Sequence, residues 1–114
     1  MLIGQSVLAP AGGAEYHTPW VPRLGDAFTQ VVEFLRGSGA LTMSCQVETK
    51  NNEDPDTSAV SLGAAFAVTT TAGSITTASR SGARELVRCK ITVTGTLADE
   101  WVHFRSNPPI WQPN

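Results

Sequence analysis

The sequence is poor in positive charge. Only two of its 114 residues are lysine and six are arginine, and the formal net charge is −2 at pH 7. Proteins that bind nucleic acids neutralise phosphates with clustered Lys and Arg side chains, and the basic residues here are scattered. We therefore expect no nucleic-acid partner.

Long apolar runs are also missing. No stretch reaches the ~20 apolar residues that a membrane-crossing helix requires. The mildly apolar residues 1–8 carry no positive charge and are interrupted by Gln5 and Ser6, which disfavours a signal peptide. We expect synthesis in the cytoplasm and no membrane partner.

Cysteine is scarce as well, since Cys45 and Cys89 are the only two. Two cysteines are too few for a disulfide scaffold, and each falls on the apolar side of an alternating segment, which predicts two buried free thiols. An immunoglobulin-type disulfide is not supported. No tryptophan lies between the cysteines, and Val87 rather than a tyrosine stands two residues before Cys89.

The chain does contain repeated alternation of apolar and polar residues, with turn formers about every ten residues. The expected strands cover residues 27–36, 41–48, 62–68, 86–94 and 102–105. Residues 69–79, rich in Thr, Ser and Ala, predict an exposed strand of a hairpin. This spacing predicts an all-β fold, an antiparallel β-sandwich or a small barrel. Residues 27–36 are apolar on both faces, which is typical of a strand covered on both sides.

The two ends of the chain have a different composition. Residues 1–25 and 106–114 are rich in proline and contain Trp20 and Trp111. Proline and glycine disfavour regular structure, so we expect an extended N-terminal arm over residues 1–25. Residues 26–114 then form one domain that ends in an irregular C-terminal tail, 106–114.

Catalytic patterns are lacking. His17 and His103 are not part of any nucleophile or zinc motif, and we expect a protein that is not an enzyme and has no metal or cofactor. The acidic residues 48–56 offer oxygen ligands that calcium prefers, but they lack EF-hand spacing. A solvated turn and a calcium loop are both open for this segment.

Large aromatic residues lie outside the central alternating strands, where they commonly anchor interfaces. The candidate interface residues are Tyr16, Trp20, Trp101, His103, Arg105 and Trp111. An alternative is that Trp20 and Trp111 cap the domain's own core. A second alternative is a carbohydrate-binding module, in which Trp101, His103 and Arg105 would form an aromatic platform.

Three segments carry a resemblance to a known class of proteins. They read QVETKNNED at 46–54, GARELVRCKITV at 82–93 and DEWVHFR at 99–105, and a Pro-Pro-Ile-Trp sequence follows at 108–111. In these segments the chain resembles small structural proteins of tailed bacteriophages, including head decoration (cement) proteins. The resemblance implies a non-enzymatic virion component made in the host cytoplasm. It would bind the major capsid protein at the capsid surface as a homo-oligomer, with a trimer favoured.

Overall fold

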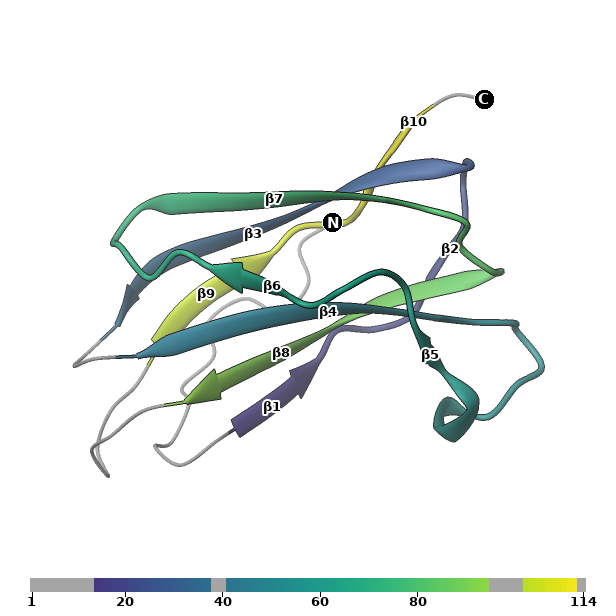
Figure 1. The fold of residues 1–114 in the computed structure, drawn as a ribbon, viewed down its shortest axis with the longest axis horizontal. Coiled ribbons are helices and arrows are strands. Elements are labelled where there is room, and N and C mark those ends of the chain that lie inside the picture. The colour runs from purple at the N-terminus through teal and green to yellow at the C-terminus, as the bar shows by residue number, and fades with distance from the viewer. Residues whose placement is uncertain (1–13, 38–40, 95–101, 113–114) are drawn as a thin grey trace.

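A computed structural model describes residues 14–37, 41–94 and 102–112. The chain forms two antiparallel β-sheets that pack face to face (Figure 1), and the predicted all-β sandwich is confirmed. Residues 1–13 of the expected arm and Trp101 lie outside the described residues.

The larger sheet is built around two nine-residue strands. β4 (Thr42–Lys50) and β8 (Leu86–Thr94) pair along their whole length, with Thr42 opposite Thr94 and Lys50 opposite Leu86. The strands that flank this pair are β1 (Ala14–His17) and β2 (Val21–Pro22) along β8, and β5 (Val60–Ser61) and β6 (Phe66–Val68) along β4. A single 3₁₀ turn, Asp56–Ser58, precedes β5.

The smaller sheet is centred on β3 (Ala27–Gly37). β7 (Ser74–Ser81) pairs with one edge of β3 along its whole length. β9 (Val102–Ser106) and β10 (Ile110–Gln112) pair with β3 as well, and because β7 already occupies one edge, both lie on the other. The chain crosses between the sheets from β2 to β3 and from β3 to β4. It crosses again from β6 to β7, from β7 to β8 and from β8 to β9.

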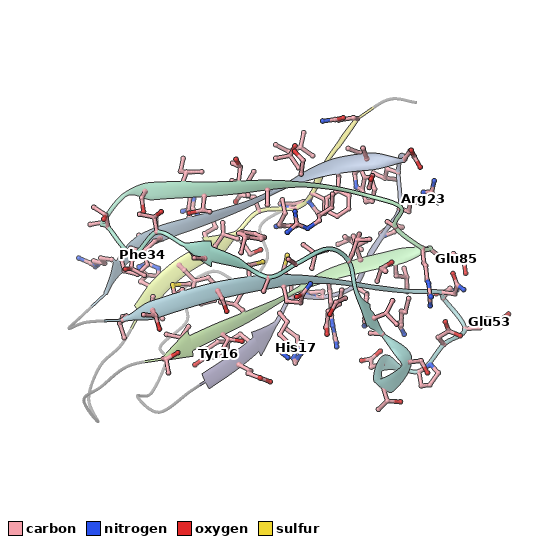
Figure 2. All side chains as sticks on the ribbon, in the orientation of Figure 1. Tyr16, His17, Arg23, Phe34, Glu53 and Glu85 are labelled. Atoms are coloured by element: carbon pink, nitrogen blue, oxygen red, sulfur yellow. The ribbon has the colours of Figure 1, made fainter. Side chains whose placement is uncertain are left out.

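Side chains that alternate along these strands fill the space between the sheets (Figure 2). The most deeply buried apolar members are Phe28, Val32, Cys45, Val47, Val87, Cys89, Ile91, Val93, Val102 and Phe104. Removing each of the larger ones from water contributes roughly 1.5–3 kcal/mol to folding. The period-two pattern therefore identified the core correctly.

The second half of the expected arm is part of the larger sheet. Ala14–His17 pair with β8, and Thr18 then forms two hydrogen bonds with the backbone of Cys89. Its N–H donates to the Cys89 carbonyl (2.9 Å) and its Oγ1 accepts the Cys89 N–H (2.8 Å). Proline is tolerated in edge strands, because only one side of such a strand joins the ladder. Pro22 in β2 therefore does not prevent this pairing, which differs from the irregular arm that the sequence favours.

The tail differs from expectation in the same way. Asn107 donates its N–H to the Val31 carbonyl (3.0 Å), and β10 then resumes the pairing with β3. Pro108 and Pro109 fall between β9 and β10, where no ladder bond is needed. Both ends of the described chain are therefore edge strands of the sandwich.

The two cysteines are free and buried, which confirms the prediction. They lie on neighbouring strands of one sheet, since Val47 stands opposite Cys89 and Cys45 is two residues from Val47. A hydrogen bond with the Cys89 side chain, together with burial, raises the pKa of the Cys45 thiol far above its ordinary value. Because both belong to the same sheet, they are not placed to bridge the two sheets as an immunoglobulin disulfide does.

This placement predicts slow thiol chemistry in the folded protein. A chromogenic disulfide reagent should react with neither thiol at mildly alkaline pH, and with both once urea has unfolded the chain. Folding stability should also fall as the pH rises past 9.0, the ordinary thiol pKa, since the unfolded chain then ionises while the folded one stays protonated. A chain unfolded without reductant that shows no reactive thiol would contradict the prediction.

Candidate functional site

The outer face of the larger sheet is charged and internally paired. The carboxylate of Glu15 lies 3.7 Å from Lys90, and Arg88 Nε donates to Glu48 Oε1 at 2.9 Å. Both cations come from β8, and their partners come from the two strands on either side of it. The charged side chains of these two pairs therefore neutralise one another between neighbouring strands of the sheet.

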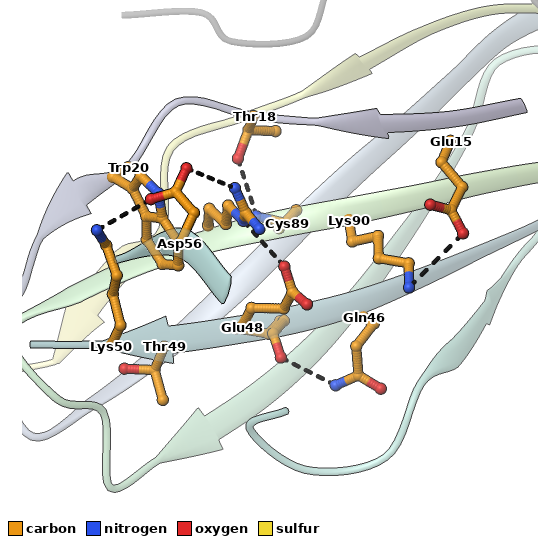
Figure 3. A network of polar contacts seen from close by, with 12 residues as sticks. Glu15, Thr18, Trp20, Gln46, Glu48, Thr49, Lys50, Asp56, Cys89 and Lys90 are labelled. Atoms are coloured by element: carbon orange, nitrogen blue, oxygen red, sulfur yellow. Dashed lines mark hydrogen bonds and ion pairs between the residues drawn. The ribbon is translucent and has the colours of Figure 1, made fainter. Parts of the chain in front are cut away.

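A compact group, the Trp20 cluster, lies at one end of this face (Figure 3). It consists of Trp20, Glu48, Lys50, Asp56 and Arg88. The Lys50 ammonium and the Arg88 guanidinium lie 5.0 and 4.4 Å from the centroid of the indole ring, within cation–π range. Trp20 Nε1 donates to Asp56 Oδ1 (3.0 Å), and Lys50 Nζ is 3.0 Å from the same oxygen.

The Trp20 cluster connects the acidic segment, residues 48–56, to the outer face of the larger sheet. Lys50 Nζ also donates to the Asp54 carbonyl (2.7 Å), and its hydrogen bond to Asp56 lowers the pKa of that carboxyl. Glu48 and Asp56 are thus neutralised by cations of the chain itself. In the part of the chain that the structure describes, no group of three or more His, Cys, Asp or Glu residues could hold a metal ion.

The outer face of the smaller sheet, here the β3 face, has a different character. Strand register places every second residue of β3 and its neighbours on this side, opposite the core positions Phe28, Val32 and Phe34. Its residues are Thr29, Val31, Glu33, Ile75, Thr77, Ser79, His103, Arg105 and Ile110. Most of these side chains are Thr, Ser, Val or Ile, in contrast to the charged outer face of the larger sheet.

The β3 face carries apolar groups that no other element of the described chain covers. Ile75 and Ile110 are 60% and 59% exposed, whereas Val31, on the strand between theirs, is only 9% exposed. Glu33 and Arg105 form an ion pair (3.7 Å). The sequence signal for this face was the apolar character of both sides of residues 27–36, which we interpreted as burial on both sides. The structure packs one side against the core, while on the outer side Val31 is buried and Thr29 and Glu33 are half-buried.

Two buried polar atoms beside the β3 face lack partners among the described residues. They are Arg105 Nε, a donor, and Asn107 Oδ1, an acceptor. A buried polar atom without a partner costs about 1–3 kcal/mol, so such atoms commonly bind an ordered water molecule or ion.

Four of the six predicted interface residues separate into two groups. His103 and Arg105 lie on the β3 face, on the strand side opposite Phe104, as the alternation predicts. Tyr16 and Trp111 turn toward the chain's own core. The Tyr16 ring lies 6.1 Å from that of Phe104, and the Trp111 ring 4.7 Å from that of Phe28.

Trp20 belongs to its own cluster, and Trp101 lies outside the described residues. The aromatic platform of the carbohydrate-binding alternative depends on Trp101, so the described residues contain only its polar members, His103 and Arg105. Trp111 packs against the core, as the capping alternative requires, whereas Trp20 contacts Lys50, Arg88 and Asp56 on the outer face of the larger sheet.

A depression of about 440 Å³ lies at the end of β7 and is lined by Ala27, Gly63, Ser79, Arg80 and Ser81. Arg80 donates to the carbonyls of Leu62 (3.0 Å), Ala64 and Ser79. Gly63 has φ +76°, and a Cβ there would lie 2.5 Å from Arg80 Nε, so glycine is required for this approach. The guanidinium is thus engaged by the chain's own backbone.

Comparisons with known proteins add no relative. The chain matches no protein-family model, and no curated protein is significantly similar to it. Among the described residues, no helix has the length and apolar character to span a membrane.

Proposed function

We propose that this chain is a non-enzymatic structural protein of a phage virion, a decoration protein that binds and stabilises the capsid surface through its β3 face. One observation carries the proposal. Ile75 and Ile110, on the strands to either side of β3, expose 60% and 59% of their surface on the β3 face, and no other element of the described chain covers them. A surface of this kind is typical of a contact with another protein.

The chemistry of the β3 face suits a large protein surface such as that of the major capsid protein. Its uncharged side chains cost little to remove from water, and Ile75 and Ile110 contribute apolar area at two different strands. A capsid repeats the same surface many times, so that an oligomer of this chain binds by avidity from weak contacts.

Co-sedimentation with capsid shells purified from the encoding phage tests the proposal. Replacing Ile110 with lysine should weaken shell binding at least tenfold, because it brings a charge into the apolar contact. Val60→Lys is the matched control, since Val60 is a 40% exposed apolar residue at an edge of the larger sheet. Its binding should equal that of the wild type, and both variants should keep the wild-type melting temperature.

The proposal fails if the wild-type chain does not sediment with the shells. It also fails if the Ile110 and Val60 variants bind equally well, because the β3 face would then have no part in binding.

A further inference from the structure

The sandwich has four sheet edges, and three of them are interrupted. Pro19 lies between β1 and β2, the turn at Gly63 separates β5 from β6, and Pro108 and Pro109 separate β9 from β10. Interruptions and prolines of this kind keep an edge from pairing with another chain. β7 is the exception, with eight continuous residues and neither proline nor lysine.

The side chains of β7 alternate in exposure along its whole length. Ser74 and Thr76 point inward and form hydrogen bonds with the backbone of Thr69. Ser74 Oγ donates to the Thr69 carbonyl (2.8 Å), and Thr76 Oγ1 accepts the Thr69 N–H (3.0 Å). Arg80, the one charged residue of β7, is held inward over the Phe66 ring at 5.5 Å. The outward residues therefore carry no charge.

The backbone of β7 pairs with a single strand in the described part of the chain. Its ladder with β3 runs from Ser74 to Ser81, and no second ladder adjoins it among those residues. The Ser79 carbonyl accepts a hydrogen bond from Arg80 (2.8 Å). The other N–H and C=O groups on the open side of β7 form a row that another strand can complete.

We infer that β7 pairs antiparallel with β7 of a second copy of this chain, across a two-fold axis near Thr77 and Ala78. Such pairing keeps the outer side chains of both copies on one face, because residues opposite each other in a ladder share a face. Thr77 then stands opposite either Thr77 or Ser79 of the second copy, depending on which residue lies on the axis. Pairs of Thr and Ser across strands are favourable.

Charge favours a second copy over a different partner. The two-fold axis brings no like charges together, since Arg80 is engaged inside its own sandwich. An acidic or basic partner strand would find no opposite charge on the outward side of β7. The pairing would join two smaller sheets into one, with two β3 faces side by side.

The pairing does not depend on the proposed function, so it is tested with the purified chain alone. Thr77→Lys and Thr77→Glu each place like charges at the joint, and each should self-associate at least tenfold more weakly than the wild type. An equimolar mixture of the two variants should recover association, because opposite charges then meet. Thr42→Lys, at an exposed β4 position in the other sheet, should associate like the wild type.

Sedimentation velocity over a range of concentrations measures the mass of the associated species, and far-UV circular dichroism checks that each variant is folded. A mass of two chains for the wild type, lost in each Thr77 variant and recovered in the mixture, supports the pairing. A wild-type chain that stays monomeric, a trimer, or Thr77 variants that associate like the wild type would overturn it. Loss of shell binding with self-association intact would count against the proposed function alone.

Discussion

A chain that lacks residues 1–22 should not fold cooperatively. The deletion removes β1 and β2, and with them the ladder along one edge of β8. It also removes the two bonds of Thr18 to Cys89 and the contacts of Tyr16 and Val21 with the core. Backbone hydrogen bonds contribute about 0.5–1.5 kcal/mol each and each buried side chain roughly 1.5–3 kcal/mol, so the loss exceeds about 4 kcal/mol.

Urea unfolding followed by circular dichroism measures this effect. Thr18→Ala gives a graded comparison and should lower the free energy of unfolding by about 1–3 kcal/mol, because the buried Cys89 N–H loses its acceptor. Thr18→Ser keeps the hydroxyl and should lose much less. If the shortened chain unfolds cooperatively near the wild-type midpoint, residues 14–22 are a dispensable arm, as the sequence alone suggests.

The second large effect is expected at Trp111. Trp111→Ala should lower the free energy of unfolding by about 3 kcal/mol, because its ring packs against Phe28 and covers one end of the core. Trp111→Phe should keep most of that stability, since it retains an aromatic contact. Thermal melts and urea titrations of the two variants beside the wild type provide the measurement.

The same variants distinguish the two roles that the sequence left open for Trp111. As a cap, the residue affects stability and leaves the oligomeric mass of the folded protein unchanged. As an interface anchor, it would show the opposite result, with unchanged stability and a lost association.

Local patterning was enough to predict the central strands. Met43, Cys45 and Val47 in β4 face the core, as do the alternating residues of β8, because period-two alternation depends only on neighbours in sequence. The exposed strand expected from the Thr- and Ser-rich residues 69–79 is present as β7, but the expected hairpin is wrong, because β7 pairs with β3 in the smaller sheet while β6 pairs with β4 in the larger one.

Features that depend on distant partners could not be predicted in this way. Pro19 and Pro22 suggested an irregular arm, but the edge of β8 supplies a ladder that tolerates them. The acidic segment suggested calcium ligands, but Asp56 meets Trp20 and Lys50 from other elements. No local signal at Asp56 indicates a tryptophan 36 residues earlier in the chain.

The placement of the end strands also affects how the protein is made. β1 cannot pair until β8 has been synthesised, and β3 has one edge without a partner until β9 and β10 follow at the end of the chain. Contacts between distant parts of a sequence slow the folding of β-proteins. The nascent chain therefore carries unpaired strand edges until β9 and β10 have left the ribosome, so that chaperones would protect those edges during this interval.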